Sequence, residues 1–207
     1  KIFAGILYEN GLLPKNKLVV KSRADLIGKY VGQTAPLIKL AVEESMGGVL
    51  FIDEAYSLFY NSKEQFDYGV EALSELVRLM EENKGKFTVI FAGYKKETLT
   101  MIESNPGLRS RITKCIEFEN YEPEELFDIA KLMLFNSKYE MDDELICDLA
   151  ISIFKNSKNK NYGNARDVRN ALESLYQIQA ERTIDDFGNM KITRNDLDTY
   201  FKEIKYV

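Results

Sequence analysis

The 207 residues carry a formal net charge of −5, and 45% are hydrophobic and 29% charged, which is typical of a folded globular protein and excludes a disordered or fibrous chain. The length suffices for one large domain or two modest ones. No apolar run approaches the roughly 20 residues that span a bilayer, and the basic residues are scattered, so we expect a cytoplasmic protein with neither a membrane nor a nucleic acid as partner.

The first half of the chain alternates strand and helix signals. Helical periodicity follows Pro36 and Val70, and glycine-containing turns end both stretches. Such an alternation predicts an α/β unit with a parallel sheet covered by helices on both faces. Short β-branched or apolar runs predict its strands at Lys17–Lys21, Val49–Ile52, Phe87–Phe91 and Lys114–Phe118.

From Tyr121 onward the signals are almost entirely helical. Helices are predicted from Pro123, after Asp142, after Asn164, and after a capping box formed by Thr193 and Asp196. We therefore divide the chain into an α/β unit, residues 1–120, and a small helical unit, residues 121–207.

The side chains present limit the chemistry. Histidine is absent, which excludes His-based triads and the commonest metal ligand. Cys115 and Cys147 lie too far apart for a paired metal or redox motif, and we expect both to be buried thiols. Carboxylates, arginines, backbone amides and a bound ion remain.

The strongest motif is the apolar run Val49–Ile52 followed directly by Asp53 and Glu54. A buried strand that ends in two acids places both at the carboxyl edge of a parallel sheet, where such sheets bind ligands. One acid can hold Mg²⁺ and the next can orient a water that attacks a γ-phosphate. Two solvated acids at the end of a strand are the alternative explanation.

Further segments follow a fixed order around this motif: Gly28–Ala35, Gly47–Tyr56, Phe91–Tyr94, Asn105–Arg111 and Gly163–Asn170. Together they closely resemble the CbbX and SpoVK branch of the AAA+ ATPases, and the resemblance covers essentially the whole chain. It implies a P-loop NTPase-type parallel sheet covered by helices and followed by a small helical lid.

The resemblance also implies roles for single residues. Asp53 would serve Mg²⁺, and Glu54 would position the attacking water on ATP. Arg111 would be the arginine finger placed in the site of the next subunit, with Arg109 as the second candidate. Arg166 would reach the phosphates from the lid.

A loop facing the central pore is implied as well. Tyr30, Val31 and Gly32 stand where AAA+ rings carry an aromatic-apolar-glycine loop that grips a protein substrate. The partners implied are further copies of the chain, as a homo-oligomeric ring of six, and a protein substrate. An ordinary turn that buries Tyr30 is the alternative.

Two features depart from the family pattern. The phosphate-binding motif Gly-x-x-x-x-Gly-Lys-Ser/Thr does not occur, and Lys1–Leu7 resembles the helix that follows it. We therefore expect the working protein to extend upstream and the 207 residues alone to be inactive. Gly93-Tyr94 stands where many relatives carry a polar sensor residue.

The resemblance favours an ATP-driven protein-remodelling motor, and we expect a SpoVK-like sporulation protein. A CbbX-type Rubisco activase is one alternative. A nucleotide-responsive assembly module with little turnover is another, for which the missing loop and the unusual sensor position are the arguments.

Overall fold

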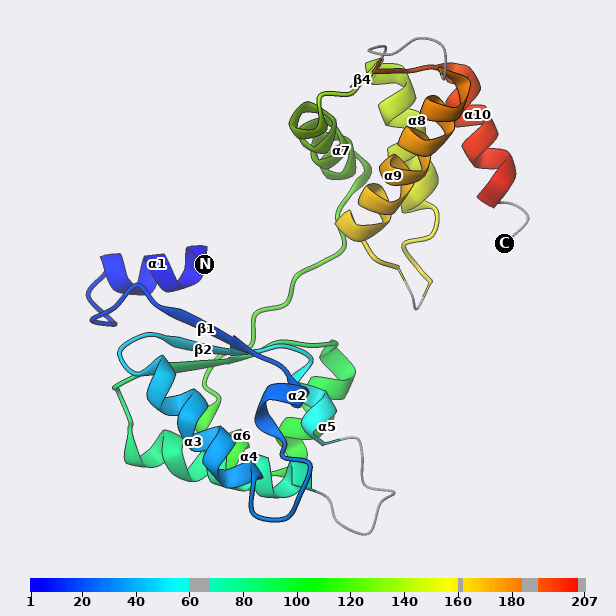
Figure 1. Cartoon of the computed structure of the whole chain (residues 1–207). Helices are drawn as coiled ribbons and strands as arrows, with labels where there is room; N and C mark the ends of the chain where they lie inside the picture. Colours follow the sequence, from blue (N-terminus) through cyan, green and yellow to red (C-terminus); the bar gives the residue numbers. More distant parts are fainter. Residues whose placement is uncertain (60–67, 160–161, 184–189, 205–207) are drawn as a thin grey trace. The chain divides into compact units, whose positions relative to one another are not determined.

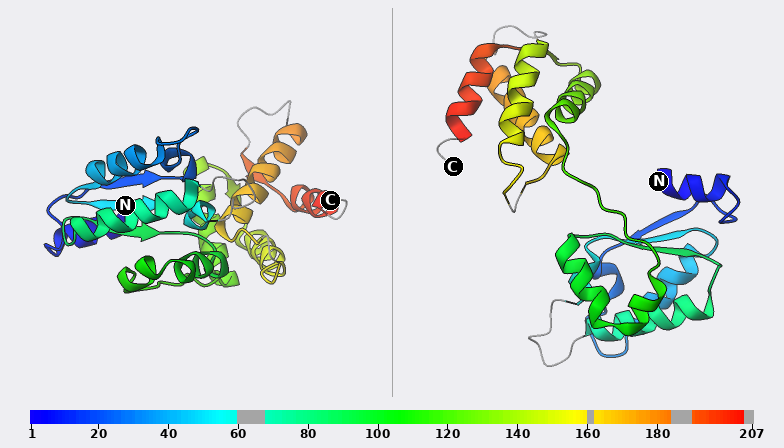
Figure 2. Two further views of the ribbon diagram at one scale, coloured as in Figure 1. Left: turned by 90° about the horizontal axis from the view of Figure 1, so that it is seen from below. Right: turned by 180° about the vertical axis from the view of Figure 1, so that it is seen from behind.

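The computed structural model describes residues 1–59, 68–159, 162–183 and 190–204. The chain forms two compact units, Lys1–Glu117 and Phe118–Val207. Figure 1 shows them in one view, and Figure 2 shows them from below and from behind. Within the described residues, no helix has the length and apolar character needed to cross a bilayer.

A parallel sheet of three strands lies at the centre of the first unit. Its order is β1 (Leu18–Lys21), β2 (Val49–Ile52), β3 (Thr88–Phe91). Lys21 pairs with Ile52, and Ile52 with Phe91, so the three strands end side by side at one edge. The predicted parallel sheet is confirmed, and three of its four predicted strands are present.

Helices cover both faces of this sheet (Figure 1). Leu50 and Ile52 belong to the apolar core that includes residues of α3 and α4. Val49 points to the other face, where it packs with Ala4 of α1, because successive side chains of a strand alternate. The helices of this unit are α1 (Ile2–Glu9), α2 (Arg23–Leu26), α3 (Thr34–Ser45), the 3₁₀-helix η1 (Ala55–Leu58), α4 (Tyr68–Glu82), α5 (Lys95–Ser104) and α6 (Pro106–Arg111).

The fourth predicted strand, Lys114–Phe118, is wrong. The segment has no strand pairing, and Ile116 and Phe118 are 63% and 91% exposed. β3 is the last strand in the order of the sheet, and no strand of the described residues pairs with its free edge. A run with strand propensity forms a strand only where a neighbour accepts its hydrogen bonds.

The second unit is a helical bundle, as predicted. Its elements are α7 (Pro123–Ser137), β4 (Glu140–Met141), α8 (Asp143–Phe154), α9 (Ala165–Arg182), β5 (Lys191–Ile192) and α10 (Arg194–Glu203). Residues of all four helices share one core, which contains Leu126, Ile146, Leu172 and Leu197. The predicted capping box is confirmed, because the Thr193 N–H donates to Asp196 Oδ2 at 2.7 Å.

The expectation of buried thiols is wrong for both cysteines, which are free and exposed. Cys115 lies in the unpaired segment after α6. Cys147 lies on α8 between the buried pairs Leu145-Ile146 and Leu149-Ala150. Helical spacing therefore turns Cys147 away from the core that those pairs enter.

Candidate functional site

The end of β2 brings Asp53 and Glu54 to the carboxyl edge of the sheet. Val49, Leu50 and Ile52 are fully buried, and both acids are exposed. The Asp53 N–H still donates to Lys21 O at 2.9 Å, which ties the first acid to β1. The Ala55 N–H donates to Ala92 O at 2.9 Å and ties the following residue to the end of β3. Both neighbouring strands thus fix the backbone around the two acids.

Glu54 has a left-handed backbone, with φ 46° and ψ 44°. A residue with a Cβ adopts this conformation rarely and at some cost in free energy, and such residues cluster at functional sites. Two hydrogen bonds hold it there. Its N–H donates to Asp53 Oδ1 at 2.9 Å, and its carbonyl accepts from the Ser57 N–H at 2.8 Å.

Asp53 and Glu54 line a hollow of about 330 Å³ beside the sheet edge. Its other lining residues are Ser22, Arg23, Ala24 and Ser57. Arg23 Nη1 donates to the Ser57 carbonyl, which links the segment after β1 to the 3₁₀-helix after Glu54.

Sequence reasoning missed Arg23, although a signal was present. Ser22 and Asp25 form a capping box directly after β1, with the Ser22 N–H and Oγ both 2.7 Å from Asp25 Oδ2. The hydrogen bond from the Ser22 backbone is the largest of the effects that lower the pKa of Asp25. A capping box at the end of a strand marks the residue after the cap as the first of a helix at the sheet edge.

Gly93 and Tyr94, at the sensor position, pack closely against Tyr56. A Cβ on Gly93 would come within 2.6 Å of Tyr56 Cδ1, so only glycine lets the Tyr56 ring lie there. The Tyr56 and Tyr94 rings lie 5.8 Å apart, and Tyr94 is 64% exposed. Burial, followed by the charge of Glu54, raises the pKa of the Tyr56 hydroxyl, so this tyrosine is neutral beside the acids.

Arg109 and Arg111 lie in the short helix α6. The Asn105 side chain caps this helix by accepting the N–H groups of Gly107 and Leu108, and Pro106 occupies a first-turn position. Asparagine followed by proline is a helix-start signal.

The two arginines differ in their contacts. Arg111 Nη2 lies 2.8 Å from Glu81 Oε2 of α4, and its Nη1 donates to the Gly107 carbonyl at 3.0 Å. Arg109 is exposed, and no hydrogen bond or ion pair holds its guanidinium within the described residues. Of these two arginines, only Arg109 has a guanidinium without a bond to the described residues.

The segment Tyr30-Val31-Gly32 forms a tight turn. The Gln33 N–H donates to Tyr30 O at 3.2 Å, and Gly32 has φ 80°, as the third position of a type II turn requires. The Gln33 side chain accepts the Tyr30 N–H at 3.3 Å. Tyr30 and Val31 are 70% and 78% exposed, which rules out a turn that buries Tyr30.

Arg166 lies in the first turn of α9, in the second unit, and is exposed. The predicted site residues thus fall into groups: two acids in one hollow, two arginines in one short helix, one exposed turn, and one arginine in the helical unit.

Of the two carboxylates in the smaller hollow, that of Asp53 suits Mg²⁺. Among the described residues no three acidic or cysteine side chains gather in a way that could hold a metal. Mg²⁺ bound with nucleotides commonly uses one or two carboxylates and takes its other ligands from water and phosphate oxygens. Asp53 fits that requirement, because Oδ1 is held by the Glu54 N–H and the side chain remains exposed.

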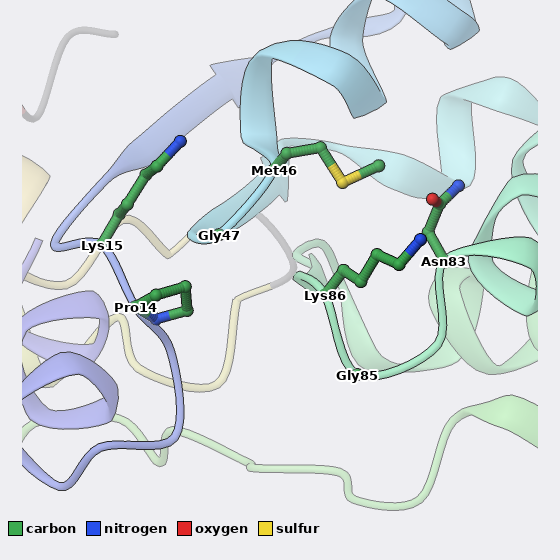
Figure 3. Close-up of a pocket in the computed structure, with 7 residues that line it drawn as sticks. All are labelled: Pro14, Lys15, Met46, Gly47, Asn83, Gly85 and Lys86. Carbon is green, nitrogen blue, oxygen red and sulfur yellow. The ribbon is translucent and has the colours of Figure 1, made fainter.

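A larger hollow of about 620 Å³ lies at the opposite, amino edge of the sheet (Figure 3). Its lining residues are Pro14, Lys15, Met46, Gly47, Asn83, Gly85 and Lys86. They include no carboxylate, and the Gly47 N–H and carbonyl are already bonded to Lys86 and Lys15. Because parallel sheets bind ligands at their carboxyl ends, the smaller hollow is the better candidate.

Comparison with protein families identifies both units. Residues 5–120 match the ATPase family associated with various cellular activities (AAA), and residues 122–205 match the AAA lid domain.

Several relatives are about two fifths identical. A CfxQ homologue of Guillardia theta and the chloroplastic ribulose bisphosphate carboxylase/oxygenase activase of Cyanidioschyzon merolae are each 42% identical over 196 residues, which cover 95% of this chain and 66% of theirs. CbbX of Cereibacter sphaeroides is 44% identical over 86% of this chain and 58% of its own. The chain therefore spans two thirds or less of the length of these relatives.

Solved structures support the fold. The Thermotoga maritima RuvB P216G mutant matches 98% of this chain and 58% of its own, with 18% identity and a TM-score of 0.65. The RuvB Holliday junction branch migration motor matches with a TM-score of 0.62. At this identity the likeness concerns the fold alone. The family matches over residues 5–120 and 122–205 show that the chain belongs to the AAA family of ATPases and carries an AAA lid.

Proposed function

We propose that the complete protein is an ATP-hydrolysing motor that works as a ring and remodels a protein substrate. The observation that carries this proposal is the pair Asp53 and Glu54. Both lie exposed at the carboxyl end of a buried central strand, and Glu54 is held in a left-handed conformation. Exposed, preset acids at this edge suit the hydrolysis of a bound nucleotide.

The residues divide the work as follows. Asp53 holds the Mg²⁺ of Mg-ATP, which when bound neutralises charge on the phosphate oxygens. Glu54 orients the attacking water and accepts its proton. Arg109 stabilises the charge on the phosphoryl group in the site of the neighbouring subunit, and Arg111 holds α6 against α4. Arg166 contacts the phosphates from the lid.

A ring is expected because Arg109 acts in the site of the neighbouring subunit. A site that one subunit completes for the next needs a repeated head-to-tail contact, and a closed ring satisfies every such contact. Six subunits are the expected number. Tyr30 and Val31, exposed on a turn, contact the protein in the central pore.

For the protein substrate, the relatives favour the Rubisco-activase alternative over the sporulation protein that we expected. One relative is named an activase of ribulose bisphosphate carboxylase/oxygenase, and another is a CbbX protein. We therefore propose a Rubisco-type carboxylase as the substrate. An assembly module with little turnover is the competing function, favoured by the unusual Gly93-Tyr94 position.

Glu54→Gln in the complete protein tests the motor. The variant keeps Asp53, so it should bind ATP as the wild type does and lose hydrolysis by at least ~100-fold, since the attacking water loses its base. Glu103→Gln, another exposed glutamate of the same unit, is the control. An assembly module predicts negligible turnover in the wild type as well.

The substrate is tested separately. Inactive Rubisco incubated with the wild type and ATP should recover carboxylase activity, and incubation with the Glu54→Gln variant should not restore it. Wild-type hydrolysis without any recovery would keep the motor and reject this substrate.

A further inference from the structure

The start of α9 contains a backbone turn with an unexpected residue. The Arg166 N–H donates to Gly163 O at 3.0 Å, so residues Gly163 to Arg166 form a four-residue turn. Asn164, the first central residue, has φ 54° and ψ −122°. These are the angles of a type II′ turn, whose first central position is normally glycine. The chain nevertheless carries asparagine there.

The glycine at position 163 has a different purpose. A Cβ on Gly163 would lie 2.6 Å from Asp167 Oδ1. The Gly163 N–H donates to the other oxygen of that carboxylate at 2.8 Å. Gly163 thus lets the Asp167 side chain cap the turn. It does not relieve the conformation of Asn164.

The Asn164 amide accounts for the asparagine. Its Oδ1 accepts the Tyr121 N–H at 2.9 Å, and its Nδ2 donates to Asn120 Oδ1, also at 2.9 Å. The Asn120 Nδ2 donates in turn to the Ser157 carbonyl at 3.1 Å. One side chain therefore ties the residues by which the chain enters the lid to the start of α9. Glycine would suit the backbone angles and would make neither bond.

We propose that Asn164 is a positioning residue for Arg166. Arg166 lies two residues beyond Asn164, in the first turn of α9. Because Asn164 is bonded to Asn120 and Tyr121, the start of α9 moves together with these two residues. Arg166 is thereby held in one position for its contact with the nucleotide. Without the clamp, the first turn of α9 is free to shift relative to the entering chain. This inference rests on the nucleotide contact of Arg166 in the proposed function.

Asn164→Gly separates the clamp from the turn. Glycine adopts the backbone angles with less strain, which offsets the stability lost with the two side-chain hydrogen bonds, so the thermal midpoint should change little. The two hydrogen bonds of the Asn164 side-chain amide are lost. Exchange of the Tyr121 amide hydrogen should therefore accelerate about fivefold, and the KM for ATP should rise by about three- to tenfold, the factors expected from one or two neutral hydrogen bonds.

Lys138→Gly is the matched control. Lys138 is another residue of the same unit with a Cβ and positive φ, 62°. Its replacement relieves a similar backbone without removing a side-chain bond, so exchange at Tyr121 and the KM should stay as in the wild type. Asn120→Ala removes one of the two bonds and should give a smaller change of the same sign.

The combination with Arg166→Ala decides whether Asn164 acts through Arg166. If it does, the double variant should have the KM of Arg166→Ala alone. Unchanged exchange at Tyr121 in Asn164→Gly would overturn the clamp. If Asn164→Gly exchanges the Tyr121 amide faster but keeps the wild-type KM, and Arg166→Ala raises the KM, Asn164 does not position Arg166. If Arg166→Ala itself leaves the KM for ATP unchanged, Arg166 does not contact the nucleotide, and Asn164 cannot position it. Exchange of the Tyr121 amide hydrogen, measured without nucleotide, would still test the clamp.

Discussion

The carboxylates of Asp196 in the lid and of Asp53 and Glu54 in the α/β unit differ in burial and in hydrogen bonding. In the lid, Asp196 is 2% exposed and accepts hydrogen bonds from Arg182 and from the backbone and hydroxyl of Thr193. In the α/β unit, Asp53 and Glu54 are exposed, and the neighbouring Glu54 N–H is bound by Asp53. A fully bonded buried acid contributes to stability, whereas an exposed acid on a strained backbone is available to a ligand.

The arginines show the same difference. Arg182 bonds Asp196 through Nε at 2.7 Å and through Nη2 at 3.0 Å. Arg109 in α6 has no such partner in the described part of the chain. Replacing a bonded group should therefore lower stability, and replacing a free group should lower activity without unfolding the protein.

The largest effect is expected at Arg109. Arg109→Ala should reduce ATP hydrolysis by about 10³-fold, the scale of a lost arginine finger, with no change in the thermal midpoint. Arg111→Ala should instead lower stability by about 1 kcal/mol, because the partly exposed bonds to Glu81 and Gly107 are lost. Steady-state turnover and thermal unfolding of both variants check this.

Mixing subunits tests the shared site. Arg109→Ala subunits keep Glu54, and Glu54→Gln subunits keep Arg109, so mixed rings should contain some complete sites and regain part of the activity. If the mixture shows only the sum of the two variants, or if a monomer is fully active, the site is not shared. If Arg111→Ala, and not Arg109→Ala, loses the activity, the finger is Arg111.

The next effect concerns stability and pH. Burial raises the pKa of Asp196, but the bonds from Arg182 and Thr193 together lower it below its usual 3.8. The folded state thus favours the carboxylate. Its contribution to stability is complete above pH 3.8 and is lost as the pH falls through the folded pKa.

Asp196→Asn should therefore cost about 2–4 kcal/mol at neutral pH, because Arg182 loses its charged partner, and this cost should shrink in acid. Denaturant unfolding of the wild type and the variant, measured from neutral pH down to below pH 3.8, gives the cost in free energy of unfolding and its change with pH. Asp198→Asn, an exposed aspartate of the same helix, should change little at either pH. A cost that is independent of pH would mean that packing, and not charge, stabilises this site.

Sequence patterns predicted the parts of the fold that depend on local signals. The apolar runs fixed β1, β2 and β3 to within a residue, and the capping box placed the start of α10. The strand expected at Lys114–Phe118 failed because strand formation depends on a pairing partner, and no strand of the described residues offers one to this segment. The buried Cys147 failed because its neighbours, and not its own type, decide which face of α8 enters the core.

The candidate site divides in the same way. Asp53 and Glu54 could be found because a buried strand running into acids is a continuous pattern. The capping box could have placed Arg23 at the sheet edge, but the sequence could not show its bond to Ser57, 34 positions away, nor the bond of Asn164 to Tyr121, 43 positions away. The family resemblance put Arg111 before Arg109 as the finger, and the ion pair of Arg111 to Glu81 is a tertiary contact that the sequence does not show.

The smallest effect on stability is expected at Tyr30, the extreme case of a free group. Contacts that do not involve the Tyr30 ring maintain its turn: the Gln33 N–H donates to Tyr30 O, and the Gly28 N–H donates to the buried side-chain hydroxyl of Thr34 at 3.2 Å. The ring itself is 70% exposed. Tyr30→Ala should therefore change the free energy of unfolding by less than about 0.5 kcal/mol, while remodelling of a protein substrate is lost with the aromatic contact.

Two variants sharpen this test. Tyr30→Phe keeps the ring and should restore remodelling, because the aromatic face supplies contact area without sequence selectivity. Gly32→Ala keeps the ring but forces a Cβ onto a backbone with φ 80°, in open space, so it should lower stability by about 1 kcal/mol through strain alone. A large loss of stability in Tyr30→Ala would show that the ring holds the turn together. Full remodelling by Tyr30→Ala would show instead that the exposed ring does not contact the substrate. The turn would then be a connection between α2 and α3 with no part in the motor.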